Sequence, residues 1–449
     1  MATTTAAAPP ARFRLRLPEA VSVLAVRDFR VFWFGQAVSM TGTWMQFVAQ
    51  GLLVLQLWDS AFALGALNFA NAIPSLCVML FGGVLADRGD KRLILLATQS
   101  VMLLLAAVIG LLVMMDAVEY WMLLVATVAL GIAFGYDMPA FQALMPELVP
   151  PEKISQVVGL NSSTFHGTRM VGPAIAGALI GVFGLATAYF LNAASFVAVI
   201  LALMMIRYRP TARRAGPATS AIEGLREGLR HASRRRNLRA LLLLTALNCV
   251  FVFPVAAILT PFYARNVLHA GPGVLGLMFT AGGFGSMMGA LALIWWSERW
   301  RVERIWFAVI VAPVGLVIQA VTREPAVAIV VQAFVSFAFS SQLGIIQTMI
   351  QESTPREYRG RVMSLHGMAF NGTVPLAAVA ISAAAVIFGL PGVMLGLAAT
   401  FFVTAAGALR FAGGGIGRVV TDSWAEYHLV AGEDMRTAVV EAAEADAAG

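Results

Sequence analysis

Two ionisable side chains lie well inside long apolar stretches of the sequence. Asp137 belongs to the stretch 119–141, and Arg169 belongs to the stretch 157–181. A charge at the centre of a membrane helix costs about 2.5–3.5 kcal/mol on insertion scales, so such a residue usually has a partner or a function. Because the two charges are opposite and lie on neighbouring stretches, we expect them to pair. The pair is either a switch that a proton or a substrate opens, with Asp137 as the titrating group, or a static salt bridge.

Other polar groups inside apolar stretches suggest a substrate cavity. His166 is a candidate proton carrier, although a helix-interior histidine whose hydrogen bonds are satisfied is the interpretation we favour for it and for His366. The stretch 31–57 is too polar for a helix that faces only lipid, and its aromatic rings and amides suit an amphipathic ligand. Hydrogen bonding between helices is the alternative. The cavity candidates are Gln36, Thr43, Trp44, Gln46, Gln50, Asn68, Asn71, Asn248, His366 and Asn371.

No enzyme signature accompanies these groups. The sequence has no phosphate-binding loop, no HExxH and no Ser/His/Asp set placed to act together. The two cysteines, Cys77 and Cys249, lie in separate apolar stretches and suggest neither a disulfide framework nor a metal site. We therefore expect no enzymatic activity, no catalytic residue, no metal and no cofactor.

The composition places the polar groups in a membrane protein. Of the 449 residues, 59% are hydrophobic and 12% are charged, whereas about a quarter of a soluble domain is charged. A membrane helix needs roughly 20 apolar residues, and bundled helices satisfy their backbone groups within lipid. We predict twelve such helices, at 31–57, 61–86, 93–115, 119–141, 157–181, 185–206, 239–263, 273–296, 305–322, 325–349, 362–388 and 391–410.

An internal repeat divides the predicted helices into two halves. Aligned without a gap, the segments 142–168 and 347–373 are identical at nine of their 27 positions. Many transporters consist of such repeats and hold the substrate near the midplane between them. We therefore predict an all-α integral membrane protein with two pseudo-symmetric six-helix bundles. The expected domains are an N-terminal lead (1–30), the first bundle (31–206), a basic connector (207–238), the second bundle (239–410) and a polar tail (411–449).

The positive charges predict the orientation in the membrane. Of the 31 Lys and Arg residues, 28 lie in the lead, the even-to-odd loops, the connector or the tail, and only Arg265 and Arg323 lie in the opposite loops. Cytoplasmic loops carry such an excess, so both termini are expected in the cytoplasm of a multi-pass cell-membrane protein. The net charge of +7 is then a topology signal, and we expect no nucleic-acid partner.

The turn between the second and third stretches, GGVLADRGDKR from Gly82 to Arg92, resembles the signature loop of the major facilitator superfamily. Asp90 departs from that pattern, which has a glycine there. The resemblance implies that Asp87 contacts the start of the eleventh helix in the other bundle, where the helix dipole favours an acid, and closes the cytoplasmic side. The alternative is a solvated basic loop. The residues concerned are Gly83, Asp87, Arg88, Lys91, Arg92, Gly360 and Arg361.

Residues 28–410 are similar to this superfamily, most of all to its branch of enterobactin exporters and macrolide-efflux proteins. The similarity rests on Asp28-Phe29-Arg30, on Thr43-Trp44-Met45-Gln46, on Asp137-Met138-Pro139-Ala140 and on Arg359-Gly360-Arg361-Val362. Phe141 departs from it, because this branch usually has an arginine there. A Gly-Pro pair in the fifth stretch, Gly172-Pro173, is related to an antiporter signature, although ordinary helix packing explains it equally well.

The resemblance implies a secondary transporter that works by alternating access. The expected function is export of an amphipathic small molecule, either a drug-like compound or a siderophore-type metabolite, in exchange for protons. The alternatives are an uncoupled facilitator or importer, and a membrane receptor or scaffold that transports nothing. The expected partners are the small-molecule substrate, protons and the lipid bilayer, and we expect a monomer.

Overall fold

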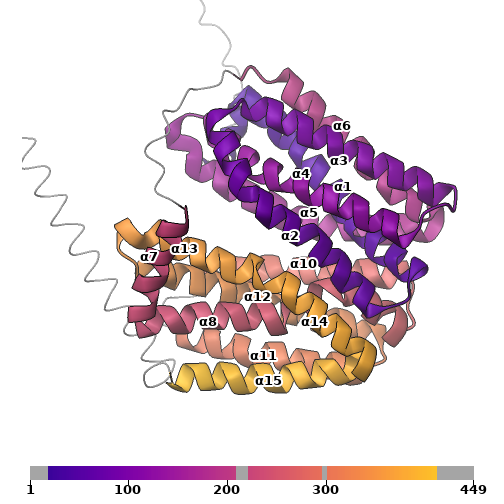
Figure 1. Ribbon diagram of the computed structural model, residues 1–449, viewed down its shortest axis with the longest axis vertical. Coiled ribbons are helices and arrows are strands. Elements are labelled where there is room, and N and C mark those ends of the chain that lie inside the picture. The colour runs from indigo at the N-terminus through magenta and orange to yellow at the C-terminus, as the bar shows by residue number, and fades with distance from the viewer. Residues whose placement is uncertain (1–18, 209–220, 296–300, 412–449) are drawn as a thin grey trace, which may run out of the picture.

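The computed structural model describes residues 19–208, 221–295 and 301–411, and every regular element in these residues is helical (Figure 1). The first half contains η1 (Glu19–Ala25), α1 (Arg27–Leu57), α2 (Ala61–Arg88), α3 (Lys91–Met114), α4 (Tyr120–Glu147), η2 (Pro151–Lys153), α5 (Ile154–Phe183) and α6 (Leu185–Met205). The second half contains α7 (Ala221–Arg234), α8 (Arg236–Phe251), η3 (Pro254–Ile258), α9 (Thr260–Phe262), η4 (Tyr263–Val267), α10 (Pro272–Trp295), α11 (Arg301–Val321), α12 (Pro325–Glu352), α13 (Arg356–Asn371), α14 (Thr373–Phe388) and α15 (Leu390–Phe411).

Ten segments of the described residues are long and apolar enough to cross a membrane. The prediction of an all-helical membrane protein is therefore confirmed. Two of the twelve predicted stretches, 31–57 and 157–181, are helical as α1 and α5 but are not among the ten. Their polar residues, including Gln46 and Gln50 on α1, lower their mean hydropathy.

Two predicted helices are interrupted. The stretch 239–263 is α8 followed by two π-helical turns, η3 and η4, which flank α9. Pro254 and Pro261 have no amide hydrogen to donate, so each removes one backbone hydrogen bond from this segment. The stretch 362–388 is divided at Gly372 into α13 and α14. The predicted connector 207–238 contains one further helix, α7, and the lead up to residue 18 and the tail from residue 412 lie outside the described residues.

The two halves share an apolar core at one end only. At this end, called the closed end, the chain turns between α1 and α2 and between α5 and α6. There Leu52 and Leu64 of the first half belong to the same buried cluster as Leu275 and Ala378 of the second. At the opposite end, called the charged end, which carries the α2–α3 turn and α7, each half has its own cluster. The ribbons accordingly converge where α2 meets α14 and diverge toward α7 (Figure 1).

Small residues bring the halves together at the closed end. Helix α5 packs against α10, and α2 packs against α14. A Cβ atom on Gly276 would lie 2.8 Å from the Cα atom of Gly177 and 2.7 Å from the carbonyl oxygen of Pro173. On the other pair, Gly65 faces Ser382. Glycine lets helix backbones approach more closely than any other residue, so this seam requires glycine at position 276.

Candidate functional site

Asp137 and Arg169 do not pair. The Asp137 carboxylate on α4 accepts hydrogen bonds from Thr98 Oγ1 at 2.6 Å and from Gln99 Nε2 at 2.9 Å, both on α3. The Arg169 guanidinium on α5 lies 5.6 Å from the ring centroid of Trp44 on α1. The predicted salt bridge is therefore wrong, because α4 directs Asp137 toward α3 while α5 directs Arg169 toward α1.

Aromatic rings that begin at Trp44, next to Arg169, extend from one half to the other. Trp44 lies 5.7 Å from Phe47 and 5.9 Å from Phe165, measured between ring centroids. Phe47 in turn lies 5.5 Å from Phe279 on α10. We call these four rings the aromatic cluster. The predicted cavity included only Trp44 of the four. The spacing of three between Trp44 and Phe47, which places both on one helix face, was the available signal for Phe47.

The aromatic cluster holds a cation and a histidine near the middle of their helices. A guanidinium over a tryptophan ring gains about 0.5–2 kcal/mol, and Arg169 has no ion-pair partner among the described residues. His166 is half-buried, and its Nδ1 atom is buried without a hydrogen-bond partner. The internally bonded state that we favoured for His166 is therefore not found. This arrangement can contact an apolar surface and a polar or anionic group of one ligand.

Four of the ten predicted cavity residues form contacts between helices of one half instead. Gln46 accepts a hydrogen bond from Asn192 at 2.7 Å, and Gln50 donates one to Thr127 at 3.0 Å. Interhelical bonding, the alternative interpretation, accounts for both. In the second half, Asn248 donates to Gln342 at 2.8 Å, and the Nδ1 atom of His366 lies 3.2 Å from Thr245 Oγ1. The favoured interpretation of His366 as a bonded histidine agrees with this contact.

The other cavity candidates are more accessible. Thr43 is exposed on α1, and Gln36 on the same helix is half-buried. Asn68 and Asn71 are half-buried on α2, and Asn371 is exposed at the end of α13. Of the predicted cavity residues, only Trp44 therefore belongs to the aromatic cluster.

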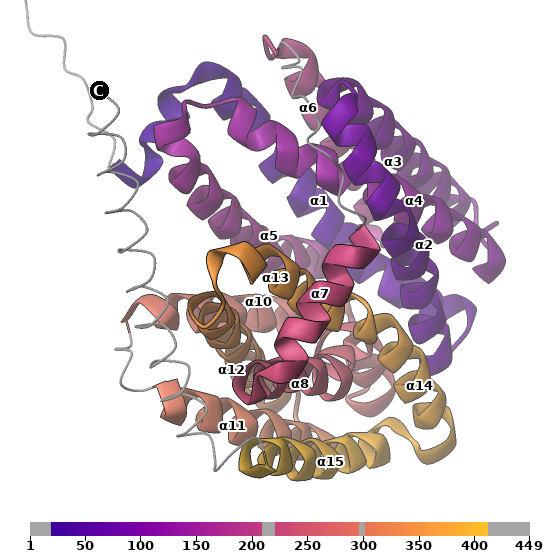
Figure 2. The same ribbon diagram turned by 60° about the vertical axis from the view of Figure 1, so that its left-hand side comes forward.

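Asp87, in the α2–α3 turn at the charged end, forms no hydrogen bond or ion pair with a described residue of α13. Asp87 and Arg88 are exposed, and no atom lies within 4 Å of a Cβ placed on Gly83 or on Gly360. Arg361 instead forms an ion pair of 2.6 Å with Glu227 of α7, which lies across α13 and α8 (Figure 2). The contact that the resemblance implied is absent because the two halves are apart at this end.

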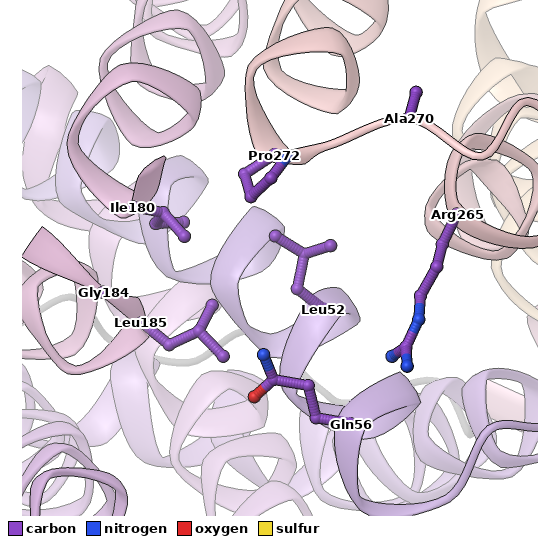
Figure 3. A pocket seen from close by; sticks show the side chains of 8 residues that line it. All are labelled: Leu52, Gln56, Ile180, Gly184, Leu185, Arg265, Ala270 and Pro272. Carbon is purple, nitrogen blue, oxygen red and sulfur yellow. The ribbon is translucent and has the colours of Figure 1, made fainter. Parts of the chain in front are cut away.

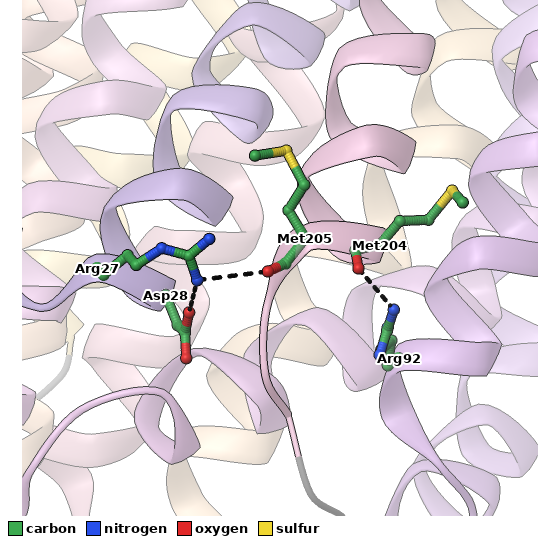
Figure 4. Close-up of polar contacts among 5 residues, drawn as sticks. All are labelled: Arg27, Asp28, Arg92, Met204 and Met205. Atoms are coloured by element: carbon green, nitrogen blue, oxygen red, sulfur yellow. Dashed lines mark hydrogen bonds and ion pairs between the residues drawn. The ribbon is translucent and has the colours of Figure 1, made fainter.

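Asp90 explains the departure from the superfamily pattern. Its carboxylate is the N-cap of α3 and accepts from the amides of Arg92 at 2.9 Å and Leu93 at 3.4 Å. An N-cap carboxylate satisfies amides that have no partner inside the helix. Nearby, Arg92 donates to the carbonyl of Met204 at 2.9 Å, while Arg27 contacts Asp28 at 2.9 Å and the carbonyl of Met205 at 3.5 Å (Figure 4). Two arginines from different helices thus satisfy the carbonyls at the end of α6.

Lys91 is buried at the charged end and pairs with Glu147 at the end of α4, with 3.3 Å between Nζ and Oε1. The hydroxyl of Tyr208 donates to the same carboxylate at 2.7 Å. Burial of the phenol, followed by the hydrogen bond to Glu147 and the charges of Glu147 and Asp90, raises the pKa of Tyr208. The phenol therefore remains a donor at neutral pH.

Replacing Glu147 by glutamine should lower the stability of the first half by about 2–3 kcal/mol, because buried Lys91 would lose its counter-charge. Thermal unfolding of the purified protein measures the loss. Tyr208→Phe removes one hydrogen bond from the same carboxylate and should cost about 1 kcal/mol. Equal effects of the two substitutions would contradict a stabilising role for the ion pair.

Comparison with known proteins identifies the class. The chain matches the sequence profile of the transmembrane secretion effector family over residues 19–427. It belongs to this family and is a transporter of the major facilitator superfamily, as the sequence had indicated. Its family and relatives are membrane transporters and not enzymes.

The individual relatives have low sequence identity to this chain. The chain is 23% identical over 355 residues to Macrolide efflux protein A of Streptococcus pyogenes, covering 78% of this chain and 87% of that protein. It is 25% identical over 183 residues to the Staphyloferrin A transporter of Staphylococcus aureus, covering 40% of this chain and 46% of that protein. A crystal structure of the nucleoside transporter NupG has a TM-score of 0.70 at 10% identity and covers 85% of this chain and 98% of that one, which shows the same fold.

Proposed function

We propose that this transporter exports an amphipathic small molecule from the cytoplasm by alternating access, in exchange for protons. In this proposal α1 and α5 are the two membrane spans that complete twelve, and the halves are two six-helix bundles. The charged end, with its Lys and Arg residues, faces the cytoplasm. The structure then represents the state that is open to the cytoplasm.

The observation that carries the proposal is the difference between the two ends. The apolar core is continuous across the halves at the closed end and divided between them at the charged end. Packed interfaces between rigid bodies tend to have discrete arrangements. Here the halves are packed together at the closed end and apart at the charged end, which suits a rocking motion of one half against the other. In the opposite state, Asp87 would reach the start of α13.

The aromatic cluster is the proposed substrate site. Phe47 and Phe165 are 38% and 41% exposed although they lie in the middle of their helices, so their rings are available to an apolar ligand. Arg169 adds a cation for a polar or anionic group. The relatives' names, a macrolide efflux protein and a staphyloferrin A transporter, support a drug-like compound or a siderophore-type metabolite as substrate.

Accumulation and growth assays with cells that contain or lack the protein test export directly. A panel of macrolides, dyes and siderophores should include at least one compound that accumulates less when the protein is present. Collapse of the proton gradient should remove that difference. A compound that enters faster in the presence of the protein would favour the importer, and a panel without any change would favour the receptor or scaffold.

Asp137 is the proposed proton carrier. When ionised it can only accept, as it does from Thr98 and Gln99, whereas the protonated carboxyl also donates. Protonation therefore changes the contact between α3 and α4. Asp137→Asn preserves an accepting oxygen but cannot titrate, so it should fold and bind substrate while proton-driven transport into vesicles falls at least about tenfold, the loss expected for an essential proton-transfer group. Proton movement equal to that of the natural protein would assign coupling to another group.

A further inference from the structure

A cavity of about 340 Å³ lies between the two halves at the closed end (Figure 3). Its walls come from the end of α1, the turn between α5 and α6, and the segment before α10. Leu52, which lines it, is eight residues beyond Trp44, or roughly 12 Å along α1 at 1.5 Å per residue. The cavity is therefore separate from the aromatic cluster.

Two polar side chains without partners line this cavity. Arg265 of η4, which is half-buried, and Gln56 of α1, which is exposed, form no hydrogen bond or ion pair with any described residue. The nearby carboxylate of Asp59 accepts a hydrogen bond from Asn266 at 3.0 Å and forms no ion pair with Arg265. Figure 3 shows Arg265 extending toward the end of α1 and not away from it. A guanidinium without an acceptor is well suited to a carboxylate or phosphate, because its N–H groups match the geometry of these anions.

Two helices also begin at the cavity. Leu185, the first residue of α6, and Pro272, the first residue of α10, both line it. The start of α6 follows Gly184, which provides no side-chain cap. Amides in the first turn of a helix have no partner within that helix, and the helix dipole is positive there. Both helix starts therefore add to the positive potential of Arg265.

We propose that this cavity binds a small oxyanion, a carboxylate or phosphate group that reaches it from the closed end. Arg265 supplies the charge, and Gln56 supplies a neutral donor. Because α1, α6 and α10 meet around the cavity only while the halves are together, a bound anion stabilises the closed end over the opposite state. The proposed anion binding depends only on the cavity. Its effect on transport depends in addition on the proposed alternating access. An anion outside the cell would thus slow the opening toward the outside.

Citrate, a tricarboxylate, is the probe for a test on the full-length protein in phosphatidylcholine nanodiscs. Titration calorimetry measures its affinity, and a pair of fluorophores, introduced as non-natural amino acids at Val182 and His269, reports the distance across the closed end. Citrate should bind the natural protein and increase the fraction with the short distance. Arg265→Gln should weaken binding at least about tenfold, as expected when a charged hydrogen-bonding group is removed.

The matched control is Arg323→Gln, which removes the other arginine predicted for this side. Arg323 donates to the carbonyls of Ala320 and Thr322 and does not line the cavity, so its loss should change citrate affinity less than about twofold, as for a distant exposed charge. Gln56→Glu is a second variant, in which a carboxylate supplied by the chain should compete with citrate. Equal weakening of citrate binding by Arg265→Gln and Arg323→Gln would overturn the proposal. It would also be overturned if citrate failed to bind the natural protein in phosphatidylcholine and phosphatidylglycerol failed to shorten the measured distance.

Nanodiscs that contain phosphatidylglycerol distinguish a lipid headgroup from a free anion. If the headgroup occupies the cavity, this lipid shortens the distance in the natural protein but not in Arg265→Gln, and citrate binds more weakly in its presence. That result supports the oxyanion site with lipid as its source. Because neither readout requires transport, failure of export in cells and failure of anion binding remain separate results.

Discussion

Gly276→Leu should reduce export at least about tenfold, as expected when one of two alternating states is strongly disfavoured, while the protein still folds and inserts. A Cβ at this position would lie 2.7–2.8 Å from the backbone of α5, and backbone atoms cannot move aside as a flexible side chain can. The side chain would therefore hold α5 and α10 apart. The apolar cores within each half do not include this contact and should remain intact.

Gly273→Leu is the control for this substitution. Gly273 lies one turn earlier on α10, and nothing lies within 4 Å of a Cβ placed there, so this variant should export normally. The drug accumulation assay measures both variants, and the thermal unfolding temperature shows whether each is folded. Normal export by Gly276→Leu would show that close approach at the seam is not required for transport.

Arg169→Met should raise the stability of the protein and abolish export. A charge within the membrane costs about 2.5–3.5 kcal/mol on insertion scales, and the contact with Trp44 returns only about 0.5–2 kcal/mol. Methionine fills a similar volume without this cost. A residue that lowers the stability of the folded protein is expected at a functional site, whereas a residue that supports the fold should raise that stability.

Thermal unfolding and substrate accumulation, measured on the same preparation, check both parts of this prediction. Arg169→Lys retains the charge and should keep part of the activity, although an ammonium makes a poorer planar contact with an aromatic ring. A less stable Arg169→Met variant would show that Arg169 supports the fold. A more stable variant with full export would remove it from the substrate site.

Membrane composition and the lengths of the apolar stretches predicted the helices well, because a helix in lipid must satisfy its own backbone. Interruptions within helices were harder to predict. The π-helical turns lie beside Pro254 and Pro261, but Pro74 and Pro139 lie inside continuous α-helices. A proline in the sequence therefore does not by itself predict a break. Helix α7 was not predicted, because a basic stretch is usually interpreted as a solvated loop.

Side-chain partners could be predicted only in part. Opposite charges on neighbouring helices suggested that Asp137 and Arg169 pair, but each helix has several faces, and the rotation of α4 decides that Asp137 meets Thr98 and Gln99. The polar residues of α1 were correctly recognised as unusual. Their division between buried bonds, such as that of Gln46 with Asn192, and the accessible aromatic cluster requires the rotation of α1 against α6 and α10.

Hydrogen bonds such as Gln46–Asn192 and Asn248–Gln342 connect helices inside a half, whereas the seam at the closed end is made mainly of apolar side chains and glycine, with the hydrogen bond from Asn266 to Asp59 at its edge. Separation of the two halves at this seam therefore exposes mainly apolar surface to water. Hydration of such surface has a large heat capacity, so under the proposed alternating access the free-energy difference between the two orientations varies with temperature along a curve and not a straight line. Under that proposal, growth temperature affects how readily the closed end opens.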